Sequence, residues 1–65
     1  MKTDRKKMML CMANSCMNLS DLAEVSGLPY PTVKNVLYGR SVRTATIGKV
    51  AKALGVKVED IVETE

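Results

Sequence analysis

The sequence predicts an all-α fold, and three observations support this prediction. No segment of the chain alternates between apolar and polar residues as a half-buried β-strand does. Apolar residues recur mostly at spacings of three and four, which is the period of an amphipathic helix. The chain has 65 residues, of which 46% are hydrophobic, so its length allows one small domain over residues 1–65. We therefore expect a compact arrangement of five short helices.

Capping residues bound the first two expected helices. The first helix is expected to begin at Thr3 or Asp4 and to end at about Asn14. The second is expected to begin at Asn18, a favourable N-cap residue, and to end before Gly27, because glycine commonly follows a helix end. The residues expected to face the core are Met8, Met9 and Met12 in the first helix and Leu22, Ala23 and Val25 in the second.

Two prolines mark the start of the third helix. Pro29 and Pro31 are tolerated there, because the first N–H groups of a helix have no intrahelical partner. The helix is expected to run from Tyr30 or Pro31 to Tyr38 and to be stopped by Gly39. Its expected inner face is formed by Val33, Val36 and Leu37.

The last two helices are expected after a basic loop over residues 40–43. The fourth runs from about Thr44 or Ala45 to Leu54 and is ended by Gly55. The fifth is expected to be short and to span residues 58–62. The expected core residues are Ile47, Val50, Ala51 and Leu54 in the fourth helix and Val58, Ile61 and Val62 in the fifth.

Composition excludes several classes of function. The chain has no His, so the commonest general base and metal ligand is missing, and an enzyme is not expected. Its two cysteines, Cys11 and Cys16, are too few for a disulfide framework or a four-ligand zinc site, and we expect both to be reduced. No signal peptide or membrane span is visible. We expect a cytoplasmic protein without cofactor, metal or small-molecule ligand.

The charge distribution is more informative than the net charge of +3. Residues 28–57 contain no acidic side chain, whereas the C-terminus is acidic. A basic middle of this kind indicates an anionic partner. On charge alone, a solvated face that keeps the protein soluble is an equally good interpretation. The basic residues of this stretch are Lys34, Arg40, Arg43, Lys49, Lys52 and Lys57.

The second and third helices form the most informative unit. A helix that ends at Gly27 and is followed after a tight turn by a second short helix is the helix-turn-helix pattern, here over about residues 19–38. In this pattern the second helix enters the DNA major groove. The outward side of that helix carries no acidic residue, which suits a phosphate backbone.

The whole chain resembles the Cro and lambda-repressor type of helix-turn-helix, also called the xenobiotic-response-element family, over about residues 8–62. The residues that carry the resemblance are Leu22-Ala23-Glu24, Gly27, Thr32-Val33, Gly39 and the run from Thr46 to Val56. The resemblance implies five short helices around one core and operator recognition by a transcriptional regulator. The sequence departs from the family pattern at Leu19, where Gln is common, at Leu37, where Glu is common, and at Pro29, where Ser or Thr is common.

The resemblance also implies two sets of DNA contacts. Lys34 and Asn35 fall where the family places groove-facing side chains, and these residue types pair with guanine and adenine edges respectively. The loop after the recognition helix normally grips the backbone. The implied base-reading residues are Tyr30, Pro31, Thr32, Lys34 and Asn35. The implied phosphate-binding residues are Asn18, Ser20, Tyr38, Arg40, Ser41, Arg43 and Thr44.

The sequence thus favours a sequence-specific, double-stranded DNA-binding transcriptional regulator that acts as a repressor at the nucleoid. One recognition helix reads few base pairs, so we expect a palindromic operator and a homodimer at least on DNA. The expected interface lies near Leu54, Val56, Val58 and Val62, with the Met-rich first helix as the less favoured surface. Two alternatives remain at this point: the antitoxin of a toxin–antitoxin pair, and a protein–protein adaptor, which Leu19 favours.

Overall fold

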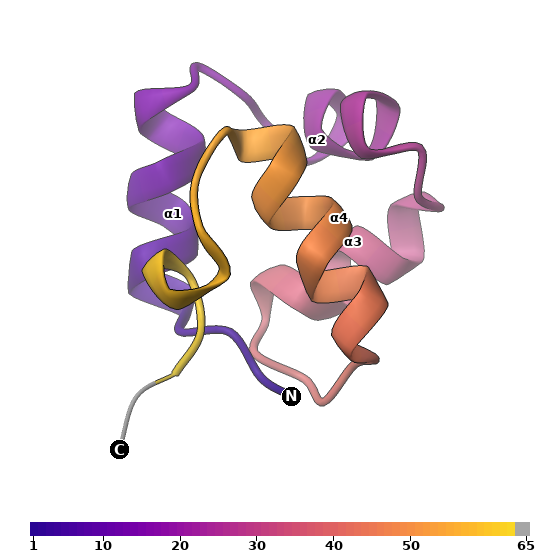
Figure 1. Ribbon diagram of the computed structural model, residues 1–65. Helices are drawn as coiled ribbons and strands as arrows, with labels where there is room; N and C mark the ends of the chain where they lie inside the picture. Colours follow the sequence, from indigo (N-terminus) through magenta and orange to yellow (C-terminus); the bar gives the residue numbers. More distant parts are fainter. Residues whose placement is uncertain (64–65) are drawn as a thin grey trace.

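The computed structural model describes residues 1–63, and this part of the chain folds into four α-helices and one short 3₁₀ helix (Figure 1). No β-strand occurs among these residues, and a single isolated antiparallel bridge joins Thr3 to Val62. The prediction of an all-α fold is therefore confirmed. The elements are α1 (Arg5–Asn14), α2 (Leu19–Ser26), α3 (Tyr30–Leu37), α4 (Thr44–Leu54) and the 3₁₀ helix η1 (Val58–Asp60).

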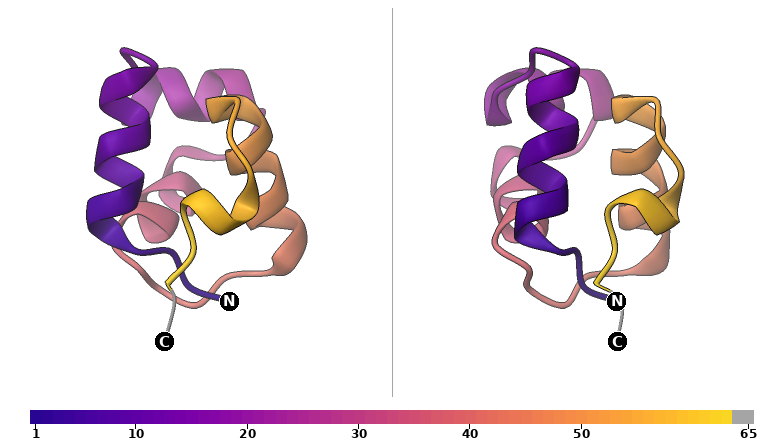
Figure 2. Two further views of the ribbon diagram at one scale, coloured as in Figure 1. Left: turned by 60° about the vertical axis from the view of Figure 1, so that its left-hand side comes forward. Right: turned by 90° about the vertical axis from the view of Figure 1, so that its left-hand side faces the viewer.

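The helices pack around one centre, with α2 against both α3 and α4, and α1 against α3 (Figure 2). In the left-hand view α1 and α4 lie on opposite sides of the molecule, and in both views α2 lies at its upper end. The N-terminal residues, the α3–α4 loop and the segment after η1 meet at the lower end (Figures 1 and 2). None of the helices in residues 1–63 combines the length and the apolar character that a bilayer crossing requires.

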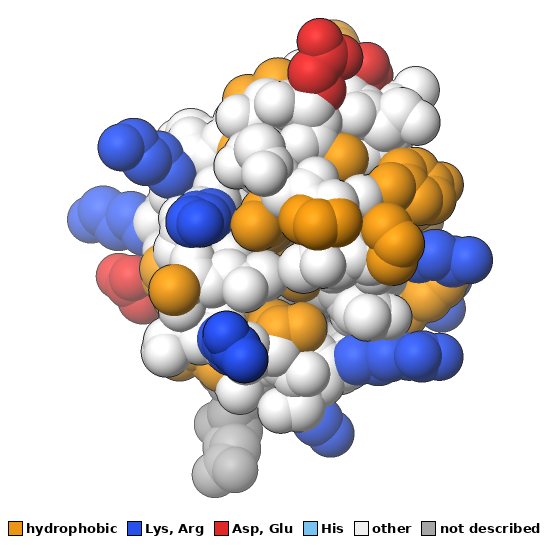
Figure 3. Space-filling view, turned by 90° about the vertical axis from the view of Figure 1, so that its right-hand side faces the viewer, with side chains coloured by type: hydrophobic (Ala, Val, Ile, Leu, Met, Phe, Trp, Pro, Cys, Tyr) orange, Lys and Arg blue, Asp and Glu red, His pale blue; other side chains and the backbone are white. Residues whose placement is uncertain are grey.

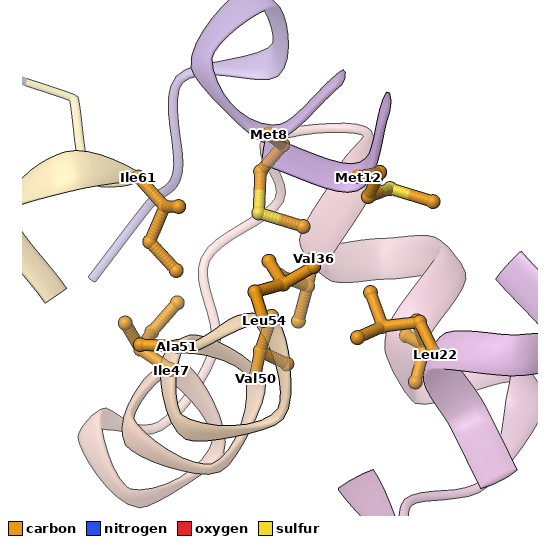
Figure 4. Close-up of a cluster of buried hydrophobic side chains, with 10 residues drawn as sticks. Met8, Met12, Leu22, Val36, Ile47, Val50, Ala51, Leu54 and Ile61 are labelled. Carbon is orange, nitrogen blue, oxygen red and sulfur yellow. The ribbon is translucent and has the colours of Figure 1, made fainter. Parts of the chain in front are cut away.

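The core consists of aliphatic side chains and the two methionines Met8 and Met12, as Figure 4 shows. All four α-helices contribute to it, and Ile61 joins it from the segment after η1. Among the described residues Thr3 is the one buried polar residue. The buried hydrophobic residues are Met8, Met12, Leu22, Val33, Val36, Ile47, Val50, Ala51, Leu54 and Ile61.

The helix ends agree with the predicted capping. Asp4 caps α1, since its side chain accepts from the N–H of Lys7 at 3.1 Å. Asn18 and Asp21 form a reciprocal capping box at the start of α2. After α2 the chain turns through Gly27, which adopts a left-handed conformation with φ of 73°.

Two residues expected in the core are exposed instead. Met9 is 57% exposed, because it points about 100° away from Met8 and about 60° away from Met12 around the helix axis. Val25 is also 57% exposed. The inner side of α2 is formed by Leu22 with its half-buried neighbours along the helix, and Val25 points more than about 60° away from it.

The predicted fifth helix over residues 58–62 is wrong beyond its first turn. Only the three residues of η1 are helical, and Ile61 leaves the helix with φ of −124°. The cause is pairing with the N-terminal residues, because Asp4 donates its N–H to the Ile61 carbonyl at 2.8 Å. Val58 and Val62 are half-buried, whereas Ile61 is fully buried.

Candidate nucleic-acid interface

The α2–α3 connection is built by residues with restricted or unusual backbone conformations. The left-handed Gly27 reverses the chain, and Pro29 then serves as the N-cap of α3 with φ of −58°. Pro31 lies at the second helical position. The two prolines leave fewer N–H donors at this end than an ordinary helix has, so α3 meets a ligand through its side chains rather than through its N-terminal backbone.

One side of α3 is exposed and the other is buried. Tyr30, Lys34 and Tyr38 are spaced by four residues, lie within about 80° of each other around the axis and are exposed. Pro31 is exposed about 20° beyond this arc, and the half-buried Asn35 lies about 60° beyond it. Val33 and Val36 fill the opposite, core-facing side. Four of the five predicted base-reading residues therefore share one surface.

Thr32 is the exception among the predicted base-reading residues. It is half-buried and lines a shallow hollow between α3 and the start of α4. Arg43 and Thr46 line the same hollow, together with Leu28, Pro29 and Val42. The structure thus places Thr32 beside a predicted phosphate-binding residue, Arg43, and away from the stripe of Lys34.

The α3–α4 loop presents three polar side chains to solvent. Arg40, Ser41 and Arg43 are exposed, whereas Val42 between them is half-buried. The loop begins with a bond from the Arg40 N–H to the Asn35 carbonyl at 3.1 Å. Arg43 is the N-cap of α4 and provides no side-chain cap. The first amides of α4, starting at Thr44, thus have no side-chain acceptor, in keeping with a phosphate contact.

Asn18 and Ser20 lie at the far end of α2 from the turn, a helix length of about 12 Å. Both are exposed. The Asn18 side-chain oxygen accepts from the Asp21 N–H at 2.8 Å, and the Asn18 N–H donates to the Asp21 carboxylate at 3.1 Å. The side-chain NH₂ of Asn18 and the Ser20 hydroxyl are the groups that this capping box leaves for a phosphate, with a carboxylate beside them.

Two cations from different helices lie near the ring of Tyr38. The Cζ of Arg5 lies 5.0 Å from the centroid of the Tyr38 ring, and the Nζ of Lys34 lies 5.8 Å from it. Both distances are within the range of cation–π attraction. Sequence reasoning missed Arg5. The run of basic residues at the N-terminus was the signal that could have pointed to Arg5. No local sequence pattern, however, places α1 beside the end of α3.

The charges on this part of the molecule are arranged by sign. Figure 3 shows Lys and Arg side chains along the sides and lower part of the face it presents, and acidic side chains at the upper and left edges. The acid-free stretch of residues 28–57 contains α3, the α3–α4 loop and all of α4. The basic loop and the stripe on α3 therefore contribute no carboxylate, and the nearest ones, Asp4 and Glu63, line a hollow beside Tyr38 and Gly39.

The α2–turn–α3 geometry, with an exposed polar side on α3 and a basic loop after it, defines a helix-turn-helix DNA-binding domain. The family model of the Cro/C1-type HTH DNA-binding domain matches residues 7–65. The chain belongs to this family, which confirms the resemblance seen in the sequence. No curated protein matches the sequence.

Three solved structures are similar to this one. The restriction-modification controller protein C.AhdI from Aeromonas hydrophila is 26% identical with a TM-score of 0.76, and the match covers 86% of each chain. A mutant of hydroxyethylphosphonate dioxygenase and native PhpD with cadmium atoms have TM-scores of 0.83 and 0.81 at 22% identity. In both cases the match covers 98% of this chain but only 14% of the other, so they share the fold of one small part.

Proposed function

We propose that this domain is a sequence-specific, double-stranded DNA-binding transcriptional repressor that acts at the nucleoid and inserts α3 into the major groove. The observation that carries the proposal is the exposed side of α3 followed by the α3–α4 loop, which present Lys34, Arg40 and Arg43 and contain no acidic residue. The family membership and the similarity to a controller protein support the same direction. Selection of bound duplexes from a random pool tests it directly, since a regulator of this kind returns one enriched motif.

We assign the DNA contacts to two groups of residues. In the proposal, Tyr30, Pro31, Lys34 and Asn35 face base edges from the exposed side of α3. Thr32 contacts the sugar–phosphate backbone beside Arg43, because both line the same hollow. The remaining phosphate contacts come from Asn18 and Ser20 on α2, from Tyr38 with its two cations, and from Arg40, Ser41, Arg43 and Thr44.

We predict that Arg40→Ala and Arg43→Ala each weaken binding to specific and random duplexes alike. Each substitution removes one cation near a phosphate, so one fewer counterion is released on binding. The slope of log K against log salt should fall in magnitude by about 1 for each variant. Titrations at several salt concentrations measure this slope. Lys52→Ala, which removes an exposed cation from the last turn of α4, is the matched control and should leave the slope unchanged. An unaltered slope in both arginine variants would exclude the loop from phosphate binding.

We predict a sequence-dependent loss for Asn35→Ala. An asparagine amide that pairs with an adenine edge discriminates by about 1–3 kcal/mol, so binding to the selected site should weaken by that amount. Binding to random duplex should change little. Asn14→Ala, at the end of α1, removes an exposed amide without touching α3 and serves as the control. Equal losses on specific and random duplexes would show that Asn35 only positions the backbone.

The adaptor alternative gains no support from Leu19. The adaptor hypothesis depended on Leu19, which is half-buried and packs against the core instead of standing free on the surface. Leu37, the other apolar departure from the family pattern, packs in the same way. Both leucines are thus explained by packing, and neither marks a protein-binding surface.

A further inference from the structure

The first four residues, here called the N-terminal strap, lie between the α3–α4 loop and the segment after η1. On the loop side the Met1 nitrogen donates to the Val42 carbonyl at 3.1 Å, and the Val42 N–H donates back to the Met1 carbonyl at 2.9 Å. On the other side the strap pairs with residues 61–63 through bonds of 2.8 and 3.1 Å. A segment 41 residues away in the sequence therefore holds the loop by backbone pairing.

Thr3 attaches the middle of the strap to α3. Its side chain is 2% exposed, and its hydroxyl donates a hydrogen bond to the Val36 carbonyl in the last turn of α3. The same carbonyl accepts from the Gly39 N–H at 3.1 Å. A Cβ at Gly39 would lie 3.3 Å from the Thr3 carbonyl oxygen, so the strap passes very close to the start of the loop.

The strap acts on the part of the loop from which the arginines project. Val42 is the half-buried residue between the exposed Ser41 and Arg43. Two backbone hydrogen bonds fix Val42 to Met1 in an extended pairing. The side chains of its two neighbours, Ser41 and Arg43, are therefore directed outward. Arg40 lies between that anchor and the α3 end that Thr3 holds. A loop fixed in this way loses less conformational entropy when it binds phosphates than a free loop does.

We infer that Thr3 is a positioning residue for the DNA surface. Its hydroxyl and the strap around it hold the α3–α4 loop in the conformation that presents Arg40 and Arg43 to the phosphate backbone. The inference rests on the proposed function as far as DNA is concerned. The structural part of the inference, that Thr3 holds the α3–α4 loop in this conformation, requires no ligand.

The direct test is Thr3→Val, which removes the donor and keeps the shape of the side chain. Loss of a buried hydrogen bond should speed amide exchange at Arg40 and Val42 by about tenfold. Affinity for the selected duplex should fall by about the same factor at a temperature where the variant is fully folded. Thr3→Ser, which restores the hydroxyl, should recover both values.

Ser15→Ala is the matched control. The Ser15 hydroxyl also donates to a backbone carbonyl, that of Leu54 at 3.3 Å, but it joins the ends of α1 and α4 at a distance from the loop. This variant should lower global stability without changing loop exchange or DNA affinity.

A second pair of variants tests the same contact from the loop side. Gly39→Ala and Gly55→Ala both place a side chain on a left-handed backbone, with φ of 74° and 70°. Only the Cβ at Gly39 meets the strap, and nothing lies within 4 Å of the one at Gly55. Exchange of the Asp4 and Glu63 amides, which belong to the strap pairing, should accelerate in Gly39→Ala alone.

The outcomes separate the inference from the proposed function. Faster exchange confined to the loop, weaker DNA binding and rescue by serine would support Thr3 as a positioning residue. Exchange that accelerates equally in α2 and α4, or loop exchange that stays unchanged, would overturn it. A wild-type protein that binds no duplex would refute the proposed function. The exchange measurement, which is made without DNA, would still decide whether Thr3 holds the loop.

Discussion

Replacing Ile47 by alanine is expected to unfold most of the protein at 37 °C. Ile47 is fully buried in α4, and this helix packs against α2 and η1. Truncating a buried isoleucine costs about 2–5 kcal/mol, because the lost side chain leaves a cavity in a close-packed core. A core of this size supplies only about 3–5 kcal/mol of net stability. The substitution therefore removes about as much free energy of unfolding as the domain has.

Val25→Ala is the control for this experiment. It also truncates an aliphatic side chain on a helix, but one that is 57% exposed, so the free energy of unfolding should change by less than about 0.5 kcal/mol. Urea titrations followed by circular dichroism, at one protein concentration and 25 °C, give both values. Similar midpoints for the two variants would contradict the placement of Ile47 in the core.

The helices were predictable because their signals are local. Asn18 and Gly27 bound α2 through capping and a left-handed turn that depend on a few adjacent residues. All four residues predicted on the inner face of α4 are buried, since an eleven-residue helix shows its period clearly. Val25 shows the limit of this reasoning: in an eight-residue helix the apolar pattern does not decide which side faces the core.

The end of the chain was not predictable from local signals. The pattern of Val58, Ile61 and Val62 fits a helix, yet the chain leaves the helix at Ile61 to pair with the strap. That pairing joins Thr3 to Val62 across nearly the whole sequence. No period or cap encodes it, because its free energy arises only after the core has brought the two ends together.

The candidate interface was predictable in part. The exposed side of α3 follows from the period of its apolar residues, so Lys34 and Tyr38 were correctly placed on one surface. The position of Thr32 depends on where α4 begins relative to α3, and the approach of Arg5 to Tyr38 depends on how α1 packs. These are tertiary contacts between segments, and they select among the polar residues that the sequence supplies.

The apolar surface left for a second protomer is small. Leu54 is 5% exposed and supplies no interface area, and Val56, Val58 and Val62 are half-buried against the core. On α1, Met9 and Leu10 are 57% and 60% exposed. A stable protein–protein interface needs about 800 Å² from each partner, which a few side chains do not provide. We therefore propose a homodimer that forms on DNA and dissociates in solution.

Scrambling one half of the selected operator is expected to weaken binding by about 2–5 kcal/mol. The exposed stripe of the eight-residue α3 is about 12 Å long, so one protomer reads only a few base pairs. Specific binding typically exceeds non-specific binding by about 4–10 kcal/mol, and a two-fold complex divides this difference between two half-sites. The half-sites should be about 10 base pairs apart, or a multiple of this, because both recognition helices must meet the same side of the duplex.

Spacing variants separate a two-fold complex from two independent sites. An insertion of about 5 base pairs turns the half-sites to opposite sides of the duplex and should abolish the gain from the second half-site, whereas about 10 base pairs should restore part of it. Sedimentation of the free protein and of complexes with one and two half-sites gives the number of protomers in each. Leu10→Lys and Val56→Lys then identify the surface, because only the one that lies between protomers loses cooperativity. A single protomer on the best operator, with equal affinity for one and two half-sites, would refute the dimer, and the few base pairs read by α3 would then be the whole recognition site.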